Sequence, residues 1–205
     1  MRPTGITVAT LNLYLGADLA PLFAAGQSEA LASRTATVWS AVEASRPAER
    51  MTAAAAQLVR YLPDVVALQE AGRWQAGTTE HPRVHDLLTS FLDALAAQGT
   101  PYRVISEGAG FSSATMSSTL ASATGQFVEL YDRTAILVRD DPAVQARNPQ
   151  QGRYRAAMRA AVLGHPLEIT RGWCAADVQV GRVRLHVMRS VFVFSSSNHT
   201  MRRIA

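Results

Sequence analysis

Hydrophobic positions along the chain switch between strand-like and helix-like spacing, and one short apolar run stands at the centre of this pattern. Residues 64–70, DVVALQE, follow Pro63 and end on the carboxylate of Glu70. A β-branched run of this length is typical of a strand buried inside a parallel sheet. Ligands of open α/β sheets bind outside the carboxyl ends of such strands, so Glu70 is a candidate site residue. From this stretch alone, a strand that leaves the core for water explains the acid equally well.

The residues before this run predict a second strand and a helix that connects the two. Residues 6–14, ITVATLNLY, predict a strand that ends near Asn12, and Pro47 and Pro63 bound a predicted helix. Its apolar stripe has helical spacing and consists of Met51, Ala55, Leu58 and Leu62. A strand–helix–strand crossover makes its two strands parallel. Because parallel strands end at the same edge of a sheet, we expect Asn12 and Glu70 to face each other there.

The remaining pattern predicts an α/β chain with a domain over residues 1–187 and a discordant tail over 188–205. The tail is set apart because its apolar run, three serines and basic end fit no period of the preceding segment. Between these limits the spacing predicts helices over 28–45 and 84–98, strands over 102–106, 127–131 and 134–139, loops over 108–126 and 148–152, and a hairpin of 173–180 with 183–187.

Composition narrows the classes of function. The 205 residues include no lysine, so all 20 basic residues are arginine and the formal charge is +4. This excludes a phosphate-loop nucleotide site and Schiff-base chemistry, both of which need a lysine. A single cysteine, Cys174, excludes an internal disulfide. No apolar run is long enough for a transmembrane segment, and the first predicted strand begins too early for a signal peptide, so we expect a cytoplasmic protein.

Three residues carry candidate chemistry: Asn12, Glu70 and Arg133. A carboxylate and an amide oxygen at one sheet edge are hard ligands of the kind that Mg²⁺ accepts. An arginine nearby would hold a phosphate through paired hydrogen bonds, although a charge at a strand edge explains Arg133 equally well. His81 and His85 have the spacing of zinc ligands on a helix, but Pro82 lies between them and a third ligand is missing, which favours surface positions.

Four segments together resemble a known family. TLNLY at 10–14, DVVALQE at 64–70, YDRTAILVR at 131–139 and RGWCAADVQV at 171–180 occur in the order found in the amino-terminal part of the endonuclease/exonuclease/phosphatase superfamily. The resemblance covers about residues 5–187. It implies part of a four-layered α/β sandwich, with two mixed sheets packed face to face and flanking helices. It also implies hydrolysis of phosphoric esters, such as nucleic acids or phospholipid head groups, with Mg²⁺ or Mn²⁺.

The resemblance implies that Glu70 and Asn12 are the catalytic metal ligands and that Arg133 contacts the substrate phosphate. The chain also departs from the family pattern at several positions. Met188, Arg189 and Ser190 stand where the family has Asn-Thr-His, and its Asp-x-Asn element and final Asp-His pair have no counterpart. We therefore expect a truncated second half, an uncovered apolar sheet face, and weak or absent activity. The alternatives are a non-catalytic module that binds phosphate or a protein, and a truncated product without function.

Overall fold

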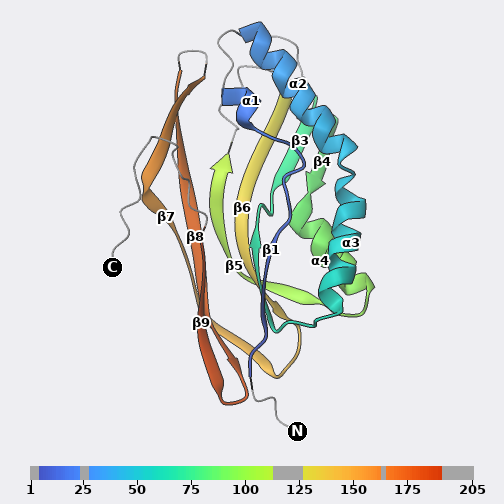
Figure 1. Ribbon diagram of the computed structural model, residues 1–205, viewed down its shortest axis with the longest axis vertical. Coiled ribbons are helices and arrows are strands. Elements are labelled where there is room, and N and C mark those ends of the chain that lie inside the picture. Colours follow the sequence, from blue (N-terminus) through green and yellow to red (C-terminus); the bar gives the residue numbers. More distant parts are fainter. Residues whose placement is uncertain (1–4, 24–27, 113–126, 163–164, 191–205) are drawn as a thin grey trace, which may run out of the picture.

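Nine strands and four helices form three layers in the described part of the chain (Figure 1). The computed structural model describes residues 5–23, 28–112, 127–162 and 165–190. The helices are α1 (Ala20–Phe23), α2 (Ser28–Ala44), α3 (Pro47–Val59) and α4 (Leu87–Ala97). The strands are β1 (Val8–Asn12), β2 (Val65–Gln69), β3 (Arg73–Gly77), β4 (Pro82–Asp86), β5 (Tyr102–Ser112), β6 (Phe127–Arg139), β7 (Val144–Val162), β8 (His165–Val180) and β9 (Val183–Ser190).

The middle layer is a mixed sheet of strands β1 to β6, here called sheet A. β1 lies parallel to β2, with Asn12 opposite Gln69, and β2 and β3 both pair antiparallel with β6. β4 extends the sheet from β3, and β5 pairs with β6. The predicted parallel strand pair is therefore confirmed, and α2 and α3 supply the crossover between its strands.

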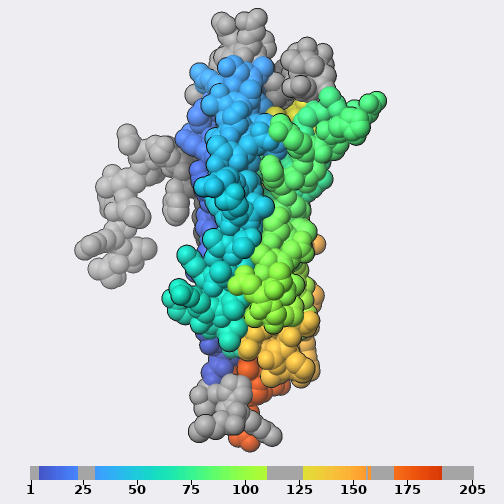
Figure 2. Space-filling view, turned by 90° about the vertical axis from the view of Figure 1, so that its right-hand side faces the viewer, coloured from blue at the N-terminus to red at the C-terminus, as the bar shows by residue number. Residues whose placement is uncertain are grey.

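Helices α2, α3 and α4 cover one face of sheet A, where they form the outer surface of the molecule (Figure 2). The predicted stripe of α3 is buried at Met51, Ala55 and Leu58, which pack with Phe91 and Leu95 of α4. Leu62 departs from the prediction, since α3 ends at Val59 and this side chain is 45 % exposed. Burial of these apolar side chains is the main source of stability on this face.

Helix α4 begins three residues later than the spacing predicts. Asp86 caps it by accepting a hydrogen bond from the backbone N–H of Thr89 at 3.0 Å. An N-cap aspartate satisfies a free helical N–H and so fixes where the helix starts. Val84, predicted in the helix, lies in β4 and is exposed. At the other end Gly99 adopts a positive φ of 73°, which suits its predicted role after the helix.

The other face of sheet A is covered by an antiparallel sheet of β7, β8 and β9, here called sheet B. Cys174, Val178, Val180 and Val187 of sheet B pack with Val65, Ile136 and Val138 of sheet A. The predicted hairpin is confirmed, with Gly181 at a φ of 58° in its turn. Sheet B packs on the very face that was expected to lie uncovered, so that expectation is wrong for the described residues. The α/β class with two packed sheets is confirmed.

Several predicted loops are strand. β6 runs unbroken from Phe127 to Arg139, β7 passes through 148–152 with a bulge, and β5 continues to Ser112. Small and polar residues hold these strand positions because each pairs with a long neighbouring strand. β9 extends to Ser190, so the change predicted at residue 188 falls inside a strand. Residues 113–126 and 191–205, the rest of a predicted loop and of the predicted tail, lie outside the described residues.

No helix in the described ranges is both long enough and apolar enough to cross a membrane. α2, the longest of the helices, has 17 residues and carries charged side chains. This agrees with the absence of a long apolar run in the sequence.

Replacing Phe91 by alanine is expected to lower the free energy of unfolding by about 3–5 kcal/mol, because Phe91 is fully buried between α3 and sheet A. The matched control is Tyr61→Ala, which removes an aromatic side chain that is 78 % exposed. Urea denaturation followed by circular dichroism measures both variants. Equal losses for the two would contradict the core described above.

Candidate functional site

Asn12 and Glu70 are in direct contact at the edge of sheet A where β1 and β2 end. The Nδ2 of Asn12 donates a hydrogen bond to Oε1 of Glu70 at 2.8 Å. The other carboxylate oxygen, Oε2, accepts from the backbone N–H of Leu15 at 2.9 Å. The structure thus brings together the two residues that parallel pairing predicts to be neighbours. Their role as metal ligands stays a prediction.

The backbone at this edge is held in an unfavourable conformation. Glu70 has a φ of 51° and Tyr14 a φ of 57°, both in the left-handed region that costs a residue with a side chain of order 1 kcal/mol or more. Arg50 of α3 supports the turn, since its Nη1 donates to the carbonyl oxygens of Leu13 and Tyr14 at 2.8 and 3.1 Å. Strained residues at a sheet edge are typical of functional sites.

A buried acid that the sequence did not single out lies near Glu70. Asp132 of β6 is 5 % exposed, and burial raises the pKa of its carboxyl to about 6, with the charge of Glu70 adding to the rise. Arg171 of β8 opposes this rise, with its Nη1 3.1 Å from Oδ2 of Asp132. Oδ1 of Asp132 and Nε of Arg171 are buried and have no hydrogen-bond partner among the described residues. This pair therefore joins the two sheets and retains unused polar atoms.

The local sequence does not mark Asp132 and Arg171 as site residues. Asp132-Arg133 interrupts an apolar run, which makes the pair look like a turn between two strands. In the continuous strand β6, successive side chains alternate, so Asp132 faces Arg171 in sheet B and Arg133 faces Asp86 at the start of α4. Arg171 opens the segment RGWCAADVQV, where the local pattern does not mark it as a site residue. Treating residues 127–139 as one continuous strand would place Asp132 and Arg133 on opposite faces of the sheet.

Arg133 forms hydrogen bonds and ion pairs with other residues of the chain. Its Nε donates to the carbonyl oxygen of Ala71 at 2.7 Å, and its guanidinium forms ion pairs with Asp86 and, at 3.7 Å, with Glu107. The side chain is 12 % exposed. Contact with a substrate phosphate stays a prediction, and these bonds give Arg133 a structural role that joins β6 to the start of α4.

Sheet B adds one more cation at this side of the sandwich. The guanidinium of Arg189 faces the side chain of Gln69, which accepts from Nη2 and Nε at 2.8 and 2.9 Å when its amide oxygen is turned toward β9. Loss of solvent around Arg189 lowers the pKa of its guanidinium. Arg189 is one of the three residues at which the resemblance expects Asn-Thr-His, so an arginine stands where that motif would lie.

The carboxylate of Glu70 is the group at this edge that would hold a hydrated Mg²⁺. Each carboxylate oxygen of Glu70 accepts one hydrogen bond from the described residues and keeps a further lone pair. Mg²⁺ binds through one or two carboxylates and retains several waters. Glu70 would be the carboxylate ligand. Asn12 points its Nδ2 at Glu70, and its Oδ1 accepts from the backbone N–H of Tyr14 at 2.7 Å, so an amide-oxygen ligand would require this side chain to rotate by half a turn.

The part of the chain that the structure describes forms no cluster of three or more metal-ligating side chains, whether histidine, cysteine or carboxylate. His85 lies in β4 and stacks on Trp39 with 5.4 Å between ring centroids, and His81 precedes that strand. The helical face that zinc spacing would require is therefore not formed.

No protein-family model, curated protein or solved structure matches this chain. What the site does must be inferred from its own contacts and charges. Those contacts place a carboxylate–amide pair at a strained sheet edge, with a buried acid–arginine pair beside it.

Asp132 is expected to make stability depend on pH between about 4 and 6. The folded chain holds this proton up to about pH 6 and the unfolded chain only up to its ordinary value of 3.8, so stability falls as the pH rises through this window. The full effect is at most about 3 kcal/mol. Urea denaturation at pH 4 and pH 7, without added metal, compares the native chain with Asp132→Asn. A stability difference between the two proteins that does not change with pH would contradict the raised pKa.

Arg133→Gln is expected to lower the free energy of unfolding by about 3 kcal/mol, because it leaves the half-buried carboxylate of Asp86 without its cation. The control Arg103→Gln removes an exposed arginine that lies 3.8 Å from Asp140 and should cost less than about 1 kcal/mol. Thermal and urea unfolding measure both. A fully stable Arg133→Gln variant would remove the structural role assigned to this residue.

Proposed function

We propose that this chain is a metal-dependent hydrolase of phosphoric esters, of the nuclease, phosphodiesterase or phosphatase type. The observation that supports it is the 2.8 Å contact between Asn12 and Glu70 at the ends of two parallel strands. These two residues would hold Mg²⁺ or Mn²⁺. A divalent ion bound there supplies charge stabilisation for a phosphoryl oxygen.

The protein groups around the pair have chemistry suited to such a substrate. Arg171 carries a positive charge on a side chain that is 27 % exposed, and a phosphate oxygen would accept from its guanidinium. Asp132, with its pKa raised to about 6, exchanges a proton close to neutral pH, as a general acid or base requires. Both side chains are largely buried, so these charges act with little screening by solvent.

Turnover is expected to be slow. Within the described ranges, no histidine forms a hydrogen bond with Glu70, Asn12 or Asp132. A positioned acid–base group contributes about 10²–10⁴-fold to the rate. The proposed hydrolase would therefore depend on Asp132 and on the bound ion for most of its rate.

The test is hydrolysis of a chromogenic phosphodiester by the full chain with Mg²⁺ or Mn²⁺, compared with Glu70→Gln. We expect that change to lower the rate by about 100-fold or more, because it removes the carboxylate charge that holds the ion. Glu49→Gln, at an exposed position of α3 in an ion pair with Arg46, serves as the control and should leave the rate unchanged. Turnover that survives Glu70→Gln at the native rate would refute the proposal.

A second candidate is a non-catalytic module that binds phosphate. Arg171 favours it, because its side chain is 27 % exposed and its guanidinium has N–H donors besides the Nη1 that contacts Asp132, from which a phosphate oxygen would accept without any metal. Calorimetry separates the two candidates. Binding of a non-hydrolysable phosphodiester that persists in excess chelator and is lost in Arg171→Gln supports the module, whereas binding that requires Mg²⁺ and Glu70 supports the hydrolase.

A further inference from the structure

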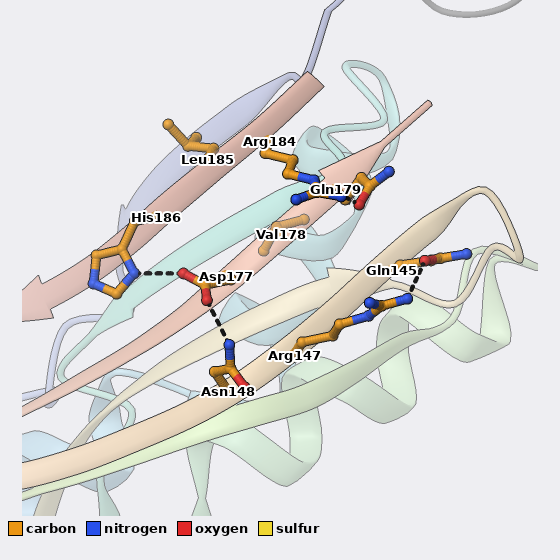
Figure 3. Close-up of a pocket in the computed structure, with 9 residues that line it drawn as sticks. All are labelled: Gln145, Arg147, Asn148, Asp177, Val178, Gln179, Arg184, Leu185 and His186. Atoms are coloured by element: carbon orange, nitrogen blue, oxygen red, sulfur yellow. Dashed lines mark hydrogen bonds and ion pairs between the residues drawn. The ribbon is translucent and has the colours of Figure 1, made fainter. Parts of the chain in front are cut away.

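The outer face of sheet B, opposite the face that packs on sheet A, carries two rows of polar side chains. Strand register places Arg147 opposite Asp177 and Asp177 opposite His186. The next row along the strands is Gln145, Gln179 and Arg184. Side chains directly opposite on neighbouring strands lie about 5 Å apart and interact. The two rows border a pocket of about 290 Å³, whose nine lining residues are drawn in Figure 3.

Asp177 forms hydrogen bonds to two neighbouring side chains at this pocket. Its Oδ1 lies 2.7 Å from Nδ1 of His186, and its Oδ2 accepts from Nδ2 of Asn148 at 2.8 Å (Figure 3). These hydrogen bonds lower the pKa of the Asp177 carboxyl, so it is ionised at neutral pH. An ionised carboxylate only accepts, which means that Nδ1 of His186 carries the hydrogen. The imidazole is thereby held in one tautomer and one orientation.

Asn148 reaches Asp177 because β7 bulges at this point. The register of β7 on β8 shifts between Arg147 and Gln150, and Asn148 has a φ of 51°. Bulges re-aim side chains and are frequent next to binding sites, and strained residues persist where their contacts over-determine them. The backbone of β7 is therefore shaped around this cluster.

Two guanidinium groups border the same pocket without an acidic partner. Nη2 of Arg147 donates to the side-chain oxygen of Gln145 at 3.2 Å, and Nε of Arg184 donates to that of Gln179 at 3.0 Å. Neither forms an ion pair with an Asp or Glu of the described residues, and Asp177 is the one acid among the lining residues. The glutamines hold both arginines by hydrogen bonds to neutral oxygens, so neither guanidinium is neutralised by a direct ion pair among the described residues.

We propose that this pocket binds a phosphate dianion, either inorganic phosphate or the terminal phosphate of a nucleoside monophosphate. Arginine matches phosphate oxygens through paired hydrogen bonds. The two guanidinium charges outnumber the single carboxylate charge of Asp177, so the lining keeps a net positive charge toward the anion. The volume lies at the small end of ligand pockets, which suits a single phosphate group with a small substituent. The site is separate from the Asn12–Glu70 edge and shares none of its residues.

The experiment is titration of the full chain with inorganic phosphate and with adenosine monophosphate in the presence of chelator. Binding is followed by calorimetry and by the imidazole NMR signal of His186, assigned through His186→Asn among the five histidines. We expect saturable binding that shifts this signal. Arg147→Gln or Arg184→Gln should weaken it about tenfold or more, since each removes a charge-assisted contact.

Arg182→Gln is the matched control, because Arg182 is an exposed arginine in the adjoining β8–β9 turn that does not line the pocket. It should leave the affinity unchanged, and so should Glu70→Gln, which makes the outcome independent of the hydrolase proposal. Tighter binding of the nucleotide would assign the nucleotide as the source of the phosphate, and equal binding would assign free phosphate. An unmoved His186 signal, or equal weakening by Arg182→Gln, would overturn the site.

Discussion

Parallel strands cannot be joined by a tight turn, and the connection from β1 to β2 therefore leaves sheet A and returns through α2 and α3. That crossover fixes which strand ends meet. It places Asn12 beside Glu70, although 58 positions separate them in the chain. Arg50 of α3 then holds the turn after β1 by donating to its carbonyl oxygens. The helices that bury the apolar face of the sheet are thus the same elements that position its polar edge.

Two neighbouring residues of β6 form ion pairs on opposite faces of sheet A. Asp132 forms an ion pair with Arg171 of sheet B, and Arg133 forms one with Asp86, which also caps α4. Removing one partner from such a buried pair costs more than the pair contributes, because the other charge is left without compensation. The main effect of these ion pairs is therefore to fix how the three layers are joined. Their net contribution to stability is small.

Elements that follow from apolar spacing and chain topology could be predicted from the sequence. Strands whose residues are small or polar could not, because they form only through pairing with a neighbouring strand. The β1–β2 crossover and the β8–β9 hairpin followed from apolar spacing and turn residues, and so did the contact of Asn12 with Glu70. Asp132 was misread because a charged pair inside an apolar run looks like a turn until its neighbours on both sides are known. Val84 was misread because its spacing fits the helix, and only the Asp86 cap fixes where α4 begins.

Sheet B, rather than a helix, covers the second face of sheet A, so its own outer face must be polar. Its inner positions, such as Cys174 and Val178, are apolar and pack on sheet A, whereas the alternate positions carry Asp177, Gln179 and His186. Since one face of an antiparallel sheet can be solvated, such alternation lets three strands cover sheet A and still face water. Scattered charged side chains are enough to keep such a face in contact with water. The bulge at Asn148 and the hydrogen-bonded imidazole of His186 add order that solvation does not require, and the proposed phosphate site would account for it.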